Sequence, residues 1–186
     1  MKQKEAISAG GGWIKKAIRS FSGSPFERLD TQWMLITAGD ANKDRSNWNT
    51  MTASWGGLGV LWNKDVAFIF IRPSRRTFSF ANDSSFFTLS FFDETRRAAL
   101  NICGEKSGRD TDKALASGLT PVFFEDGPAA GAVSFREARD ILFCKKLYTQ
   151  DINPAHFLDE SIAKNYNGND YHRMYIGEIV EYRCSS

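Results

Sequence analysis

The sequence predicts a mostly β protein, an antiparallel barrel with helices at its periphery. Three observations favour this class. Six segments rich in β-branched and aromatic residues are distributed along the chain. Helical patterns lie between them but do not alternate with the strands as βαβ units require, which argues against a doubly wound sheet. At 186 residues, the chain has the length of a single domain.

The predicted strands cover residues 31–39, 49–57, 66–72, 86–92, 138–152 and 171–184. The segment VAFIFIR at 66–72 is apolar at successive positions rather than at alternate ones. We therefore expect both of its faces to be buried, as in a barrel strand covered by a helix or by a second subunit.

Four helices are predicted, over residues 74–84, 93–104, 109–118 and 153–166. Their predicted capping residues are Ser74, Asp93, Asp110 and Asn153 at the N-terminal ends, and Gly104 and Gly118 at two C-terminal ends.

Residues 1–30 are predicted to be an N-terminal extension to the domain at 31–186. Within the extension, we expect residues 1–12 to be mobile about the joint Gly10–Gly12. Residues 13–21 are predicted to form a short amphipathic helix, either a solvent-facing cap or a helix on a membrane surface.

Composition and charge exclude several classes of function. Lysine and arginine number 24 and acidic residues 22, and a net charge of +2 is too small for a dedicated nucleic-acid or polybasic membrane surface. No apolar run reaches the length of a membrane span, and the N-terminus has no secretory h-region, so we expect a cytoplasmic protein. Cys103, Cys144 and Cys184 are widely spaced, which favours free thiols over a disulfide framework or a metal site.

A candidate anion site lies in the run Arg72–Thr77, where the strand at 66–72 passes into the helix at 74–84. Arg75 and Arg76 fall in the first turn of that predicted helix, where positive side chains oppose the helix dipole unless an anion is bound. Free N–H groups, guanidiniums and hydroxyls together suit a phosphate. The alternative is that these arginines form a solvated helix face.

A second candidate segment is NTMTASWGG, at residues 49–57, which contains no acid and no base. Its hydroxyl and large aromatic side chains belong to Thr50, Thr52, Ser54 and Trp55. The backbone N–H and C=O groups of Met51–Ser54 suit the polar edge of a flat heterocycle, and the glycines allow a close approach. The alternative is an ordinary strand and a glycine-rich turn, since the following residues do not match a G-x-G-x-x-G fingerprint.

A third segment, LNICGEKSGRDTDK at residues 100–113, connects two predicted helices. Bare backbone N–H groups around Ser107 and Gly108 suit the ribityl or phosphate oxygens of a ligand. Cys103 is a candidate for contact with a cofactor. The alternatives are an ordinary surface loop and a small cysteine that only packs.

Taken together, these segments resemble the flavin reductase-like, flavoredoxin-type family of FMN-binding split barrels. The resemblance is carried by NTMTASW, by the Arg-Pro-x-Arg-x-Thr run and by NICGEKSGRD. With FFTLSFF, YTQDI and YHRMYIGEIVEY, it covers most of residues 31–183. It implies a six-stranded antiparallel Greek-key split β-barrel, a homodimer, and FMN held in a groove near the subunit interface.

The resemblance also implies which residues hold FMN. The isoalloxazine would be lined by Met51, Thr52, Ala53 and Ser54, the phosphate held by Arg72, Ser74, Arg75 and Thr77, and the neighbouring loop would supply Gly104, Lys106 and Ser107. Thr50, Trp55 and Cys103 complete the predicted site from the residue patterns. His172 matches a family position near the flavin, although a strand-end surface histidine is the alternative.

Three parts of the chain depart from the family pattern. They are residues 1–30, Arg76 where an aromatic residue is expected, and residues 124–140. The last region tends to shape substrate access in the family, so the identity of the electron acceptor is not predicted.

The implied activity is an oxidoreductase whose chemistry is supplied by the cofactor. Hydride passes from NADH or NADPH to flavin N5 when the two rings stack, and a backbone N–H stabilises the negative charge that develops, so no acid–base pair is required. One alternative is a flavoredoxin-like electron-transfer flavoprotein that holds FMN and uses a protein redox partner. Another is a flavin-binding or haem-type binding protein without turnover.

Overall fold

The computed structural model describes residues 12–128, 130–166 and 168–186. The strands are β1 (Trp13–Lys16), β2 (Met34–Gly39), β3 (Trp48–Ala53), β4 (Gly56–Leu61), β5 (Lys64–Ile71), β6 (Phe86–Phe91), β7 (Pro121–Phe123), β8 (Val133–Phe135), β9 (Asp140–Asp151) and β10 (Arg173–Ser185). The α-helices are α1 (Thr77–Asp83), α2 (Arg97–Glu105) and α3 (Lys113–Ser117). Short helical turns occupy Ile18–Ser20, Glu27–Thr31, Glu94–Arg96, Pro154–His156 and Glu160–Asn165.

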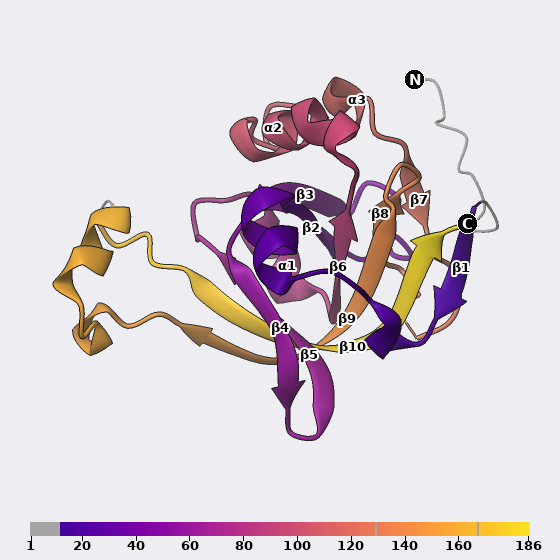
Figure 1. The fold of residues 1–186 in the computed structure, drawn as a ribbon. Coiled ribbons are helices and arrows are strands. Elements are labelled where there is room, and N and C mark those ends of the chain that lie inside the picture. Colours follow the sequence, from indigo (N-terminus) through magenta and orange to yellow (C-terminus); the bar gives the residue numbers. More distant parts are fainter. Residues whose placement is uncertain (1–11, 129, 167) are drawn as a thin grey trace.

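The main sheet is antiparallel and curls into a barrel. Its strands follow the order β3-β2-β6-β9-β10-β5-β4, and β1 pairs with β10 as well. The two edge strands, β3 and β4, are separated in the chain only by Ser54 and Trp55. Because the three Cα–Cα steps from Ala53 to Gly56 span at most about 11 Å, the two edges of the sheet must meet at this corner (Figure 1). The predicted fold class is confirmed, with eight strands in the main sheet of the described residues instead of six.

In the N-terminal half of the chain, the strand predicted at 49–57 and the helix predicted at 13–21 are wrong. Residues 49–57 are not one strand, because β3 ends at Ala53 and the chain turns before β4 begins at Gly56. Residues 13–21 do not form a helix: β1 extends the sheet at β10, and Trp13 Nε1 donates to the carbonyl oxygen of Ala138 at 2.9 Å. The open edge of β10 supplies backbone partners that an isolated amphipathic segment lacks. The predicted joint at Gly10–Gly12 falls almost wholly outside the described residues.

The helix ends also differ from the sequence pattern. α1 begins at Thr77 instead of near Ser74, and α2 continues through Gly104 to Glu105. The side chain of Asp112, not Asp110, caps α3 by accepting from the N–H of Leu115. The end of α3 at Gly118, with a φ of 70°, is as predicted. Residues 153–166 form two 3₁₀ turns in place of one helix, and Asn153 caps the first of them.

The core consists of two clusters, one on each face of β2. Met34 and Ile36 belong to the cluster inside the barrel, whereas Leu35 packs with the residues of α2, α3 and β7–β8. Figure 1 shows α2 and α3 lying together over one side of the barrel. The expectation that both faces of residues 66–72 are buried holds only in part, because Phe68 and Phe70 on the outer face remain half-buried. Phe70 lines a cavity on that face.

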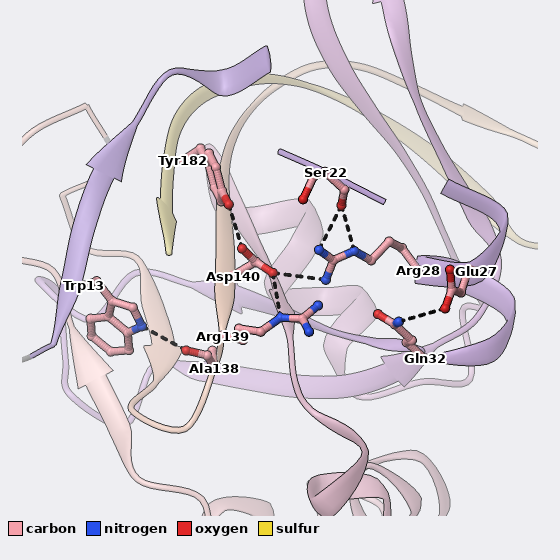
Figure 2. A network of polar contacts seen from close by, with 9 residues as sticks. All are labelled: Trp13, Ser22, Glu27, Arg28, Gln32, Ala138, Arg139, Asp140 and Tyr182. Carbon is pink, nitrogen blue, oxygen red and sulfur yellow. Dashed lines mark hydrogen bonds and ion pairs between the residues drawn. The ribbon is translucent and has the colours of Figure 1, made fainter. Parts of the chain in front are cut away.

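A buried ion pair attaches the N-terminal segment to the barrel (Figure 2). Arg28 Nη1 lies 3.0 Å from a carboxylate oxygen of Asp140, the first residue of β9, and both side chains are less than a tenth exposed. The guanidinium also donates twice to the carbonyl oxygen of Ser22, and Tyr182 donates to Asp140 at 2.7 Å. Residues 22–28 are therefore fixed to the same strands that build the barrel.

Two projections extend from the barrel (Figure 1). One is the hairpin of β4 and β5, and the other is the arm, residues 152–166 and 168–172, carried by the far ends of β9 and β10. The arm ends at His172, directly before β10, and so returns to the corner formed by Ser54 and Trp55. Within the described residues, no helix is long and apolar enough to cross a membrane.

Candidate functional site

Two adjacent cavities open beside the corner where β3 and β4 meet. The first, which we call the corner cavity, has a volume of about 170 Å³ and is lined by Met51, Thr52, Ala53, Ser54, Trp55, Phe70, Arg72, Arg75 and His172. The second, the basic cavity, has a volume of about 120 Å³ and is lined by Met51, Ser74, Arg75, Arg76, Thr77, Glu105, Lys106, Ser107, Gly108, Arg109 and Lys113. Both share Met51 and Arg75, so they form neighbouring halves of one groove.

The corner cavity is built from three parts of the barrel. The end of β3 and the corner supply backbone and small side chains, the end of β5 supplies Phe70 and Arg72, and the end of the arm supplies His172. The rings of Trp55 and His172 lie 5.2 Å apart, and Trp55 is 47% exposed. β3 is an edge strand, so backbone N–H and C=O groups on its outer side have no strand partner among the described residues. The cavity thus combines aromatic side chains with the backbone of an edge strand, which suits a flat heteroaromatic ligand.

His172 is a neutral imidazole at physiological pH. Burial and the positive charges of Arg72 and Arg75 lower its pKa to about 4, although Asp170 acts in the opposite direction. Its Nδ1 lies 3.0 Å from the hydroxyl of Tyr166. The residue is 8% exposed, so it is not the surface histidine that was the alternative prediction.

The basic cavity concentrates positive charge. Five of its lining residues are cationic, namely Arg75, Arg76, Lys106, Arg109 and Lys113, against a single carboxylate, that of Glu105. Hydrogen bonds fix two of the guanidiniums: Arg75 donates to the carbonyl oxygen of Gly104 at 3.0 Å, and Arg109 to that of Ser74 at 3.1 Å. A cluster of this kind attracts a multiply charged anion.

Lys113 is the buried member of this cluster. Its Nζ donates to the carbonyl oxygens of Thr50 at 2.8 Å and Cys103 at 2.7 Å, and the residue is 7% exposed. Burial lowers its pKa to about 8, because an ammonium group loses solvation there, and the positive charge of Arg75 lowers it further. None of the ion pairs among the described residues includes Lys113.

Most of the run Arg72–Thr77 lies before the helix, because α1 begins only at Thr77, with Arg76 as its N-cap residue. Ser74 lies in a turn before α1, and its hydroxyl and N–H both donate to the carboxylate of Asp170, at 2.6 and 3.0 Å. Arg75 therefore reaches the cavities from this turn, not from a helical first turn. Thr77 is fully buried, and its hydroxyl accepts from the amide of Asn49 at 2.8 Å.

The structure brings most of the predicted site residues together, but not all of them. Thr50, Cys103 and Gly104 line neither cavity. The Thr50 hydroxyl is engaged with Thr37 at 2.9 Å, and burial raises the pKa of the Cys103 thiol, which keeps it protonated. Of the predicted phosphate set, Arg72 lines only the corner cavity, Ser74 and Thr77 line only the basic cavity, and Arg75 lines both.

The sequence patterns missed four lining residues: Phe70, Glu105, Arg109 and Lys113. Arg109 follows directly on the predicted loop residues Ser107 and Gly108, so the glycine-rich loop was a usable signal. The sequence gives no such signal for Phe70 and Lys113, because an apolar strand residue and a lysine in a polar helix pattern are both common.

The sequence from residue 26 to residue 186 matches the model of the family described as the flavin reductase-like domain. The chain belongs to this family. The resemblance seen in the sequence motifs is thereby confirmed. No curated protein matches the sequence.

Solved structures resemble this flavin reductase-like domain over most of its length. The FMN-binding domain of a flavin reductase-like enzyme from Shewanella baltica is 13% identical, with a TM-score of 0.63 over 93% of this chain and 77% of that one. A flavoredoxin from Desulfovibrio vulgaris is 20% identical, with a TM-score of 0.62 over 93% and 78%. An NADH:FAD oxidoreductase from Streptomyces globisporus, solved with NAD and FAD fragments, is 17% identical, with a TM-score of 0.56 over 83% and 81%. At these identities, the likeness shows the fold.

The groove of this flavin reductase-like domain fits a flavin mononucleotide in its chemistry. A flavin joins a flat, hydrogen-bonding ring to a phosphate, and the groove joins a backbone-lined aromatic cavity to a cationic one through Met51 and Arg75. Lys113 adds a buried positive charge without an ion pair in the described residues, which an anion would compensate. Among the described residues that line the corner cavity, none is acidic.

Proposed function

We propose that this domain binds FMN and transfers hydride from NADH or NADPH to the flavin. The observation that carries the proposal is the pair of joined cavities, one aromatic and lined by strand backbone, the other lined by five cationic side chains. The ring belongs in the corner cavity and the phosphate in the basic cavity. The flavin, when bound, supplies the hydride-accepting ring.

The roles of the chain's own residues follow from this placement. The backbone of Met51–Ser54 orients the polar edge of the ring, and Trp55 forms a wall beside it. Arg75, Lys106, Ser107 and Arg109 bind the phosphate with charge-assisted hydrogen bonds, and Lys113 contributes charge from below. Arg72, which lines the corner cavity, is placed to meet a second negatively charged or polar group near the ring.

Two measurements on the purified protein test the proposal. The first is a titration of the protein with FMN, followed by the absorption bands of oxidised flavin. If FMN binds, these bands should shift, and the shift should saturate at one FMN per chain. Anaerobic mixing of the FMN-loaded protein with NADH, and separately with NADPH, should bleach the oxidised flavin band. Absence of a saturable spectral change with FMN contradicts the proposed cofactor.

The second candidate function is electron transfer from a protein donor to bound FMN. The similarity in fold to a flavoredoxin and the exposed indole of Trp55 beside the corner cavity favour it. The same mixing experiment separates the two functions. Bleaching by NADH or NADPH at a rate well above that of free FMN supports the reductase, whereas FMN that binds but is bleached only by a chemical reductant supports the electron carrier.

We also propose that the domain is a homodimer. Val60 and Trp62 on the β4–β5 hairpin are 64% and 54% exposed, and the ring of Trp62 lies 6.2 Å from that of Tyr148 on β9. Trp62 and Asn63 form the two-residue turn between β4 and β5, and both have a positive φ, 53° and 58°, as such a turn requires. Sedimentation equilibrium of the wild type and of Trp62→Lys tests this: a dimer that the substitution dissociates is expected, and a monomeric wild type overturns it.

A further inference from the structure

Tyr166 connects the arm to the corner cavity without lining it. Its hydroxyl oxygen lies 3.0 Å from Nδ1 of His172, which does line that cavity. Tyr166 belongs to the part of the arm that returns toward β10. A contact of this kind controls how the imidazole faces the cavity, because the hydrogen bond made by one ring nitrogen decides which nitrogen carries the proton.

The ring of Tyr166 is held from three sides. Phe157 stacks on it at 6.0 Å with an interplanar angle of 19°, and the ring of Tyr171 lies 4.8 Å away. The guanidinium of Arg72 lies 5.1 Å from the ring centroid and donates to the neighbouring carbonyl oxygen of Asn165 at 2.7 Å. The phenol is thus fixed in direction, so its hydroxyl stays aimed at His172.

The chemistry of the pair decides the direction of the hydrogen bond. Both groups are neutral, because burial raises the pKa of the Tyr166 phenol and lowers that of His172 to about 4. A phenol O–H is a stronger donor than a neutral imidazole N–H, and an imidazole nitrogen is a stronger acceptor than a phenol oxygen. The arrangement O–H···Nδ1 therefore prevails, and it leaves the single imidazole proton on Nε2.

We propose that Tyr166 is a positioning residue that donates to Nδ1 of His172 and so presents an Nε2–H donor to the corner cavity. Because Nδ1 is directed at Tyr166, Nε2 lies on the other side of the ring, and His172 lines the corner cavity. A donor there recognises a carbonyl oxygen or an anionic ring nitrogen of a flat heteroaromatic ligand, and it rejects ligands that present a donor at that position. The ligand class rests on the proposed function, whereas the tautomer does not.

The tautomer is measured directly on the flavin-free protein. The sequence contains two histidines, and His156→Gln leaves a single imidazole, that of His172. At pH 7, long-range ¹H–¹⁵N correlation spectra are expected to show Nε2 protonated and Nδ1 unprotonated. Tyr166→Phe, which removes only the hydroxyl, is expected to shift both nitrogens toward averaged values as the two tautomers mix.

Tyr171→Phe is the matched control. Its ring contacts the same cluster, but no hydrogen bond of its hydroxyl is found in the described part of the chain. The His172 nitrogens should not move in this variant. A wild type with Nδ1 protonated, or an unchanged tautomer in Tyr166→Phe, overturns the proposal, and the wild-type spectrum decides even where a variant does not fold.

A double-mutant cycle shows whether Tyr166 acts on the ligand through His172. Tyr166→Phe is expected to weaken FMN binding by about 3–10-fold in the wild-type background and by less than twofold in a His172→Phe background. Equal losses in the two backgrounds overturn the claim that Tyr166 acts through His172. Should no variant, the wild type included, bind FMN, the proposed function fails while the imidazole spectra still test the tautomer.

Discussion

The ammonium group of Lys113 donates to the carbonyl oxygen of Thr50, 2.8 Å away, in the strand whose next residue lines both cavities. This contact connects the start of α3 to the middle of β3, two segments more than 60 residues apart in the chain. It places a titratable positive charge beneath the basic cavity. The charge state of Lys113 therefore affects anion binding.

FMN affinity should decrease as the pH rises through 8. Burial lowers the pKa of Lys113 to about 8, and a bound phosphate stabilises its protonated form, so FMN binding above pH 8 requires uptake of a proton. We expect binding to be about tenfold weaker at pH 9 than at pH 7. Only the interval from pH 8 to pH 9 lies above the pKa of the free protein, and each pH unit above that pKa lowers the affinity by up to about tenfold. Fluorescence titrations with FMN over pH 6.5–9 measure this.

Two controls isolate Lys113 in that experiment. Riboflavin lacks the phosphate, so its weaker binding should change little over the same pH range. Lys113→Met should bind FMN more weakly at pH 7 and show a flat profile between pH 8 and pH 9. A slope that is equally steep for riboflavin, or that persists in Lys113→Met, contradicts the role assigned to this ammonium group.

Arg75 should discriminate FMN from riboflavin. It lines both cavities, and its guanidinium is fixed by the carbonyl oxygen of Gly104. A charge-assisted hydrogen bond contributes about 1.5–3 kcal/mol, so we expect Arg75→Gln to weaken FMN binding by about 10–100-fold. Riboflavin binding should change much less. Arg136→Gln, an exposed arginine that lines neither cavity, should leave both affinities unchanged. Parallel losses for FMN and riboflavin in Arg75→Gln would place Arg75 at the ring instead.

Local sequence patterns predict much of the fold. The β-rich runs at 66–72, 86–92 and 171–184 predicted β5, β6 and β10 closely, because each is bounded by residues that stop a strand. The polar backbone at Met51–Ser54 predicted the corner cavity, because a strand without acids or bases but with glycines after it is unusual. These signals depend only on neighbouring residues, which is why the sequence alone was sufficient.

The remaining features depend on contacts between distant segments. Trp13–Lys16 form β1 only because the edge of β10 is available, and residues 13–21 carry a helical pattern in isolation. Serine is a common helix-capping residue, yet the hydroxyl of Ser74 donates to the carboxylate of Asp170. The hydroxyl of Thr50 could bind a ligand, yet it is hydrogen-bonded to the hydroxyl of Thr37 on the adjacent strand. In each case the local structure or the hydroxyl's partner is determined by a hydrogen bond to a residue distant in the sequence, which local patterns do not reveal.

Gly108 should not accept a side chain. A Cβ atom at this position would lie 2.0 Å from Oδ1 of Asn49, whose amide donates to the Thr77 hydroxyl in the basic cavity. We expect Gly108→Ala to displace Asn49, to lower the free energy of unfolding by about 1–3 kcal/mol and to weaken FMN binding. Denaturant titration and FMN titration measure the two effects.

Gly59→Ala is the comparison for that substitution. A Cβ at Gly59 meets only the ring of Phe68 at 3.9 Å, an ordinary contact. Its stability and FMN affinity should remain close to those of the wild type. Should Gly108→Ala behave like Gly59→Ala, the packing of Asn49 against the 106–109 loop does not shape the basic cavity.

Removing Arg28 should destabilise the whole domain. Asp140 is buried, and its partners are Arg28, Arg139 and Tyr182, so Arg28→Met leaves a carboxylate without its main charge partner at the start of β9 (Figure 2). Breaking a buried ion pair by removing one partner costs about 3–5 kcal/mol. Urea denaturation measures this loss, with Arg19→Met as the control, because the pair of Arg19 with Asp65 is exposed and contributes little. An equal effect of the two substitutions would mean that residues 21–28 are attached by apolar contacts, such as those of Phe21 with Phe91, and not by the ion pair.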